Sequence, residues 1–237
     1  MSNLIVTTYV DAAIAQLRRL DMMCWPGKLP DSMRDDSIPP SDDWHGWKAI
    51  PSTVTETELN DLERETGLVF PPLYRDFLRY KYFVELTERG VRFERHLPLD
   101  WSNVLRQKYF RSWPRERILN VGLLPFGSES QMDAGPVCFD TNRRDAAGDC
   151  PVVFWDHEWV DTENEVRPMF SSSARMFESL CFVATNDLNF FYHDESDDSA
   201  LLPKKQTLLA KFLSFDPEGA GGPARDYWTC WGVTPAT

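Results

Sequence analysis

Short apolar runs, each ended by glycine, aspartate or a polar cluster, mark the middle of this chain. Apolar runs of this length between turn residues are typical of β-strands, and their close succession favours one antiparallel sheet. A polar segment at residues 141–149 separates two of them and is predicted to be a surface turn. The predicted strands cover residues 118–124 with the adjoining run 123–127, then 137–140, 152–155 and 166–170.

Apolar residues at helical spacing predict helices on both sides of this block. Near the N-terminus the spacing covers residues 3–24. Towards the C-terminus it covers 174–184, which Ser171–Ser173 would cap, and 201–215. Residues 25–43 are rich in proline, aspartate and serine, and we predict a linker without regular structure there.

Aromatic residues near both ends of the sequence are expected to pack on the folded domain. Trp44 and Trp47 would hold the linker against it. The segment 227–231 would fold the glycine- and proline-rich tail, 216–237, back onto it. An acidic loop is expected at residues 193–199, before the last helix.

The clearest local signal begins at Thr55. Thr55 and Glu58 have the spacing of a capping box, and Gly67 suits the left-handed position that ends such a helix. Pro72 then suits the first turn of a second helix, whose apolar pattern extends to Tyr82.

The segment between this helix and the strands has weaker patterns. Apolar stretches at 84–86 and 91–93 suggest a hairpin. Asp100 or Ser102 is expected to cap a helix that runs to Phe110.

Net charge favours some partners over others. The formal charge is −12, and the sequence pI is about 4.8. Surfaces that bind nucleic acid or anionic membranes need clustered lysine and arginine, so neither partner is expected. An acidic surface steers towards a basic protein, although it also simply keeps a soluble protein dispersed.

The cysteines and the N-terminus indicate the compartment. The five cysteines are widely separated and form no Cys-x-x-Cys pair, which is typical of buried free thiols in a reducing compartment. The N-terminus lacks the basic region of a secretory signal, and no apolar stretch approaches the length of a membrane span. A cytoplasmic location is therefore expected.

Motifs for catalysis or metal binding are incomplete. His157 and Glu158 begin a zinc-binding pattern, but Asp161 stands where the second histidine is needed. Residues 127–130 lack the second glycine of a nucleophile elbow, and 219–222 lack the flanking strand and lysine of a phosphate loop. We predict no catalytic residues, no metal and no cofactor.

Four motifs follow one another over residues 44–184. An acidic helix leads through a glycine and a proline to a tyrosine-led second helix. A Leu-Pro-Phe-Gly run with Cys-Phe-Asp, an apolar run ending in Trp-Asp-His-Glu, and a Ser/Phe-rich helix come next. The residues are Glu58, Leu59, Leu62, Glu63, Gly67, Pro71, Tyr74, Phe77 and Leu78; Leu124–Gly127 and Cys138–Asp140; Pro151–Glu158; and Phe170 with Phe177–Leu180.

In order and spacing, these motifs resemble the SMI1/KNR4 (SUKH) superfamily, bacterial immunity-protein type. The chain departs from that pattern in a longer segment between Tyr82 and Leu123 and in both flanks. The resemblance implies an α+β fold, with a central mostly antiparallel sheet and helices packed on one side. It divides the chain into an N-terminal helix and linker (1–43), an SMI1/KNR4-like domain (44–184), and a C-terminal helix and tail packed on that domain (185–237).

One segment combines acidic and aromatic residues in the way a protein-binding surface does. Five carboxylates and two tryptophans crowd the connection between the last two predicted strands. A solvated hairpin tip explains them, and so does a patch that meets lysine and arginine of a toxin. The candidate partner-binding residues are Trp155, Asp156, Glu158, Trp159, Asp161, Glu163 and Glu165.

The resemblance favours a protein that is not an enzyme. Bacterial members of the superfamily are similar to immunity proteins that bind and block toxins, many of them nucleases. The leading hypothesis is direct neutralisation of a cognate toxin domain, without turnover or cofactor. The alternatives are a scaffold or regulatory module of the same fold, and an enzyme with a concealed carboxylate pair. A neighbouring toxin gene would favour the first, and a deep polar pocket with carboxylates of shifted pKa would favour the last.

Overall fold

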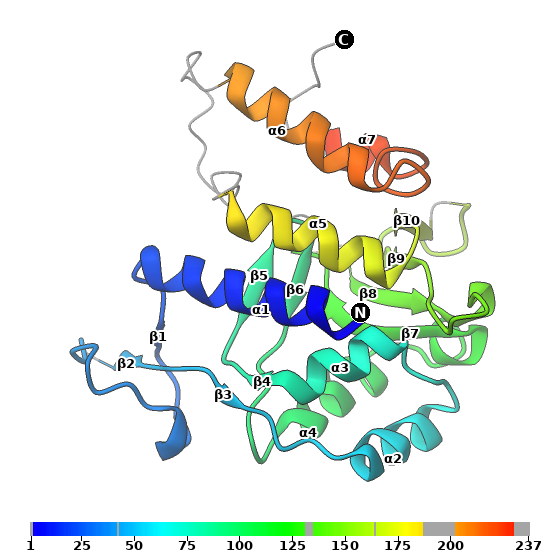
Figure 1. Ribbon diagram of the computed structural model, residues 1–237. Coiled ribbons are helices and arrows are strands. Elements are labelled where there is room, and N and C mark those ends of the chain that lie inside the picture. The colour runs from blue at the N-terminus through cyan, green and yellow to red at the C-terminus, as the bar shows by residue number, and fades with distance from the viewer. Residues whose placement is uncertain (1, 42, 131–134, 164, 187–201, 230–237) are drawn as a thin grey trace.

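Six strands form one antiparallel sheet in the order β10–β9–β8–β7–β6–β5 (Figure 1). The computed structural model describes residues 2–41, 43–130, 135–163, 165–186 and 202–229. It confirms the predicted α+β fold with helices on one side of the sheet. The strands are β5 (Leu86–Glu88), β6 (Val91–Phe93), β7 (Leu123–Ser128), β8 (Pro136–Asp140), β9 (Val152–Trp155) and β10 (Val166–Phe170).

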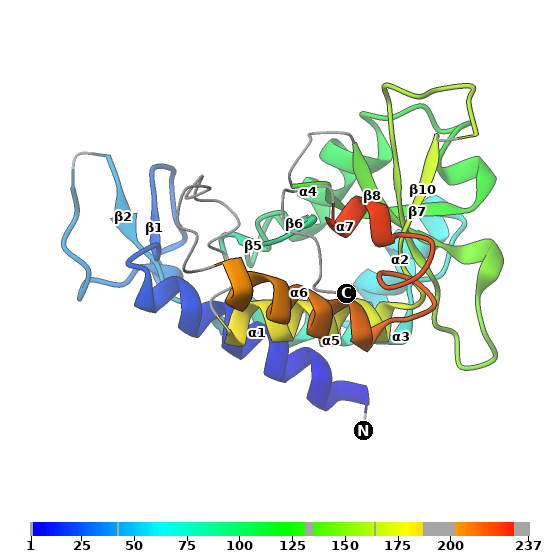
Figure 2. The same cartoon turned by 90° about the horizontal axis from the view of Figure 1, so that it is seen from above.

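Three helices cover one face of this sheet: α1 (Ser2–Arg19), α3 (Pro72–Tyr80) and α5 (Ser173–Thr185). Figure 2 shows them in one layer, with α6 (Leu202–Phe215) lying along α5. The remaining elements are β1 (Cys24–Trp25), β2 (His45–Gly46), β3 (Ile50–Pro51), α2 (Glu56–Thr66), β4 (Lys81–Tyr82), α4 (Trp101–Leu105) continued by a π-helix (Arg106–Phe110), α7 (Arg225–Thr229), and 3-10 turns at Asp31–Met33, Leu119–Val121 and Thr141–Arg143.

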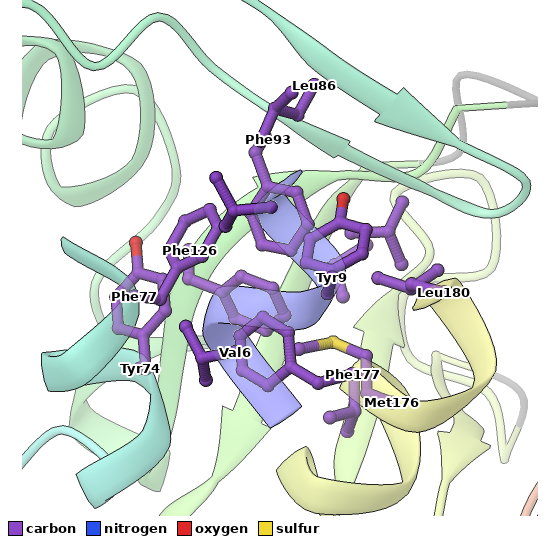
Figure 3. Close-up of a cluster of buried hydrophobic side chains, with 14 of the residues drawn as sticks. Val6, Tyr9, Tyr74, Phe77, Leu86, Phe93, Phe126, Met176, Phe177 and Leu180 are labelled. Atoms are coloured by element: carbon purple, nitrogen blue, oxygen red, sulfur yellow. The ribbon is translucent and has the colours of Figure 1, made fainter. Parts of the chain in front are cut away.

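An aromatic cluster joins the helices to the sheet (Figure 3). The Phe77 ring of α3 lies 4.6 Å from the Phe93 ring of β6 and 5.5 Å from the Phe177 ring of α5. Tyr9 of α1 lies 5.8 Å from Phe177. All four side chains are essentially fully buried. A buried aromatic side chain removes a large apolar area from water, so this cluster is the main apolar contact between the two layers.

The predicted helix ends around α2 and α5 are confirmed. The Thr55 hydroxyl accepts from the Glu58 amide at 3.3 Å, and the Glu58 carboxylate accepts from the Thr55 amide at 2.8 Å. Gly67 has φ 76° and ends α2. Ser172 is the N-cap of α5, with its hydroxyl accepting from the Arg175 amide at 3.1 Å. These contacts satisfy backbone groups that a helix end would otherwise leave unpaired.

The first helix is shorter than predicted. It ends at Arg19 instead of extending to residue 24. Asp21 adopts a left-handed φ of 54°, and the Met22 amide donates back to the Leu17 carbonyl at 2.9 Å. This reversal ends the helix as a glycine cap would. An aspartate accepts the left-handed conformation more readily than most side chains do.

The prediction of a linker without regular structure is wrong for part of residues 25–43. Strand β1 pairs with β2, and the 3-10 turn places Met33 fully inside the core. The Lys48 amide donates to the Met33 carbonyl at 2.9 Å. Proline and aspartate prevented long elements but not short pairings. Of the two tryptophans expected to hold this segment, Trp47 is buried, whereas Trp44 is about half exposed, with a relative accessibility of 48%.

Two further boundaries differ from the prediction. Residues 81–82 do not continue α3 but pair as β4 with β3, because Lys81 is already extended at φ −140° and ψ 146°. The first part of the strand predicted from residue 118 is not extended: Leu119–Val121 form a 3-10 turn with Ile118 at its N-cap, and β7 begins after Gly122, which has φ 83°. Short apolar runs in the sequence do not distinguish a strand from a helix or a 3-10 turn.

The middle segment matches its predicted elements in type. The hairpin is formed by β5 and β6, two residues later than expected on its first strand. The helix predicted to reach Phe110 begins at Trp101 and changes to a π-helix at Arg106. Asp100 occupies its N-cap position without a side-chain cap. Segment 141–149 is a turn, as predicted.

The C-terminal segment packs on the domain, and its tail contains the short helix α7, which was not predicted. Trp228 of α7 is fully buried, and its indole N–H donates to the Met169 carbonyl of β10 at 3.1 Å. The Asp216 carboxylate, also buried, accepts from the backbone amides of Ser171 at 2.7 Å and Ala220 at 3.2 Å, and from the Ser171 hydroxyl. The expected acidic loop at 193–199, and residues 230–231 of the expected aromatic contact, lie outside the described residues.

Among the cysteines, Cys138 and Cys150 are buried free thiols, as predicted, whereas Cys24 and Cys181 are half-buried. Cys230 lies outside the described residues. Within the described ranges, no helix is long and apolar enough to cross a membrane.

Asp216→Ala should lower the free energy of unfolding by about 2–4 kcal/mol, since it leaves buried donors without an acceptor. Urea denaturation followed by circular dichroism measures this change. Glu218→Ala, at an exposed position two residues away, should change it by less than about 0.5 kcal/mol. Equal effects of the two variants would contradict the anchoring role of Asp216.

His96 should make stability depend on pH. Burial lowers its pKa from 6.5 to about 4, and its Nε2 donates to the Leu78 carbonyl at 2.8 Å. Between these values the unfolded chain takes up a proton that the folded protein does not. Stability should therefore fall by about 1.4 kcal/mol per pH unit as pH decreases through this interval. Urea denaturation at several pH values measures the free energy of unfolding as a function of pH. In His96→Gln this free energy should fall less steeply with decreasing pH, by the contribution of one proton. The same pH dependence in both proteins would refute this role.

Candidate protein-interaction site

The predicted acidic segment is the connection between β9 and β10. Val166 pairs with Trp155, so the loop leaves and re-enters the sheet at neighbouring positions. Backbone hydrogen bonds close it internally: the Asp156 amide donates to the Glu165 carbonyl at 2.8 Å, and the Trp159 amide donates to the Asp156 carbonyl at 3.1 Å. Asp161 turns the chain with a left-handed φ of 64°. The described residues of the loop thus follow a defined path.

Glu165 is the main brace of the loop. Its carboxylate accepts from the indole N–H of Trp155 at 2.7 Å and from the Asp161 amide at 2.9 Å. Arg117 approaches the same carboxylate at 3.3 Å and pairs with Asp161 at 2.8 Å. The hydrogen bond from Trp155 is the largest cause that holds the pKa of Glu165 below its usual value. A carboxylate used in this way stabilises the loop itself.

Asp156 braces the start of the loop. Its side chain is buried, accepts from the Glu158 amide at 3.0 Å and pairs with Arg167 of β10 at 3.1 Å. A buried carboxylate needs such compensation because losing its water is costly. Asp156 therefore positions neighbouring groups and is not available to a partner.

Trp155 belongs to a second, smaller apolar cluster on the sheet face opposite the helices. It is 3% exposed and packs with Ile118, Leu123, Cys138 and Val153. The half-buried Trp113 ring lies 5.5 Å from it in an edge-to-face arrangement. The alternation along β9 explains this placement, because Val152 and Phe154 face the main core while Val153 and Trp155 face the smaller cluster. Trp155 supports the loop from below and does not flank it on the surface.

The remaining four candidates are exposed: Glu158, Trp159, Asp161 and Glu163. The Trp159 side chain is 45% exposed, and the Arg167 guanidinium lies 5.4 Å from its ring centre. Neither Glu158 nor Glu163 forms a salt bridge within the described part of the chain. The outer surface of the loop therefore presents one aromatic ring beside carboxylates that are open to a cation.

Sequence reasoning missed three residues of this site, namely Trp113, Arg117 and Arg167. Arg117 is 48 positions from the Glu165 it contacts, so no local pattern links the two. Arg167 follows the loop closely, and its position in β10 next to the acidic segment was a signal. Its pairing with Asp156 still depends on the strand register.

The largest pKa shifts occur away from the acidic loop. The groups whose pKa values move furthest, Tyr74, His96, Tyr109 and Cys138, are enclosed in the interior and are shifted mainly by lost hydration. None of them lies in the loop. Within the described residues, no three histidine, cysteine or acidic side chains are grouped to hold a metal ion.

Comparison with known families identifies the domain. A model of the SMI1/KNR4 family (SUKH-1) matches residues 53–179. The chain belongs to the SMI1/KNR4 family. The match begins just before α2, contains all six strands of the sheet and ends within α5. No curated protein matches the chain.

The SMI1/KNR4 match includes the acidic loop but not all of the core. Helix α1, which supplies Tyr9, precedes the matched residues, and α6 and α7, which supply Trp228, follow them. Both side chains are fully buried. In this member of the family, the flanking helices are therefore part of the same hydrophobic core.

Glu165→Ala should loosen the loop without unfolding the domain. Removal of the carboxylate takes away the acceptor of the Asp161 amide, so hydrogen exchange of that amide should accelerate by about tenfold or more. Glu163→Ala, which removes an exposed carboxylate from the same loop, should leave that amide unchanged. Exchange measured by NMR distinguishes the two, and equal protection in all three proteins would show that Glu165 is not the brace.

Proposed function

We propose that this SMI1/KNR4 protein is of the immunity type, and that it neutralises a cognate toxin domain by direct binding without catalytic turnover. The observation that carries the proposal is the braced acidic loop. The buried Trp155 and Asp156 and the half-buried Glu165 hold the backbone, while Glu158 and Trp159 project outward. A surface that is ordered before binding loses less entropy when a partner docks.

Charge supports a basic partner. The chain carries a formal charge of −12. Five of its carboxylates lie in the loop, and the two guanidinium groups of Arg117 and Arg167 neutralise only part of their charge. Complementary fields accelerate the encounter of two proteins and weaken as salt is added. A toxin that acts on nucleic acid needs a basic surface, so its substrate-binding face is the natural target of such a loop.

Trp159 supplies the apolar centre of the contact. Tryptophan is enriched among the residues that dominate binding energy at protein interfaces. Arg167 already lies over this ring. A partner's arginine would therefore meet the remaining surface of the ring and the carboxylates of Glu158 and Glu163.

The decisive experiment uses the full chain with an affinity tag, recovered from its native cells. Mass spectrometry of the bound fraction should identify a basic domain at near-equal stoichiometry. Expression of that domain alone should stop growth, and co-expression with this protein should restore it. Recovery of only a non-toxic cellular protein would refute the immunity function and favour the regulatory-scaffold alternative.

The loop variant Glu158→Lys/Glu163→Lys should slow association with that domain by about 10- to 100-fold and flatten its salt dependence. These two carboxylates are chosen because Asp161 and Glu165 brace the loop. Asp31→Lys/Asp36→Lys makes the same change in charge at exposed positions of the N-terminal segment and should slow association far less. Surface plasmon resonance measures both rates. If the two double variants behave alike, the binding surface is not this loop.

A further inference from the structure

A pocket of about 240 Å³ lies at the open end of the β5–β6 hairpin. Two of its residues immediately precede β5 and two immediately follow β6. Because β5 and β10 are the two edge strands, the pocket and the acidic loop lie at opposite edges of the sheet. The lining residues are Trp25, Val84, Glu85, Glu94, Arg95, Val104, Gln107 and Lys108.

The size of the pocket limits its occupant. Sites for cofactors and drug-sized molecules usually measure roughly 300–1,000 Å³. This pocket is smaller and suits a single long side chain. The half-buried Trp25 and Val104 offer apolar surface to such a chain, and the carboxylates would contact its end.

Glu85 supplies the negative charge of the pocket that no salt bridge within the described residues neutralises. Its carboxylate accepts from the Thr87 hydroxyl at 2.7 Å and forms no salt bridge within the described residues. The other charged groups are engaged, since Glu94 pairs with Lys108 and Arg95 lies 3.6 Å from Asp100. A half-buried carboxylate beside an indole ring is a combination that attracts a cation.

The backbone at the rim is unusual in a way that supports a binding role. Residues 106–110 form a π-helix, with the Arg111 amide donating to the Arg106 carbonyl at 3.0 Å. Tyr109 is directed inward and buried, while Gln107 and Lys108 are exposed at the pocket. Single π-helical turns are rare and occur frequently at functional sites.

We propose that this Trp25–Glu85 pocket receives one arginine or lysine side chain of the basic protein partner. The partner would then meet the domain at a second point, away from the acidic loop. The pocket relies on Trp25, which lies outside the matched SMI1/KNR4 residues, so this contact would distinguish the chain from family members that lack the N-terminal segment. The inference rests on the proposed function for the identity of the partner, but not for the chemistry of the pocket.

The test uses the full-length 15N-labelled protein and a small probe in place of the partner. Nα-acetyl-arginine amide is titrated while the indole N–H signal of Trp25 is followed by NMR, with Trp25→Phe assigning that signal. The signal should shift and saturate with a dissociation constant of about millimolar size. Nα-acetyl-citrulline amide has nearly the same shape without the charge and should not cause a saturable shift.

Matched variants decide the origin of the shift. Glu85→Gln keeps the acceptor for Thr87 and should weaken binding by about tenfold, whereas Glu163→Gln removes the same charge from the acidic loop and should leave it unchanged. Lys108→Gln removes the cation that competes with the arginine probe for Glu94, so the probe should bind more tightly. No saturable shift with the arginine probe, an equal response to citrulline, or unchanged binding by Glu85→Gln would overturn the proposal.

This titration separates the two proposals. It needs no toxin, so a negative result removes the pocket while leaving the acidic loop and the neutralisation experiment intact. If the capture experiment instead recovers no toxin while the probe still binds, the pocket stands and only the identity of its natural partner changes.

Discussion

The packing of Phe77 against Phe93 and Phe177 is the contact on which the rest of the structure depends. It joins one central helix to the sheet and to α5, and Tyr9 brings α1 into the same cluster. Aromatic side chains bury large areas and fit few alternative arrangements. The sheet therefore has one orientation relative to its helices, and the edges of the sheet, with the loop and the pocket, take their places from it.

The opposite face of the sheet supports the acidic loop. A small cluster around Trp155 lies under the acidic loop, and the Trp155 indole joins that cluster to the carboxylate of Glu165. The apolar layer and the polar brace thus support each other. This coupling explains how the described residues of an acidic loop keep a defined path: Asp156, Asp161 and Glu165 accept hydrogen bonds or pair with arginine, while Glu158 and Glu163 form no salt bridge within the described residues.

The flanking segments extend the matched domain at both ends. Trp25 from the N-terminal segment lines the pocket, and Trp228 from α7 covers β10 and bonds to Met169. The C-terminal flank also reaches the β5–β6 turn, where Arg89 donates to the Trp228 carbonyl. An exposed edge strand tends to pair with other chains, and a covering segment lowers that risk. A family domain is here completed, and given an additional surface, by residues outside it.

The sequence alone determined the elements whose signals are local: the capping box at Thr55, the cap at Ser172, the strands β8 and β9, and through its motifs the family and fold class. Tertiary structure decided what depends on distant partners. It paired Lys81 with β3 instead of extending a helix, and it separated the buried Trp155 from the exposed Trp159. The physical reason is range, because caps and turns act within a few residues, whereas strand pairing and burial join positions far apart in the chain.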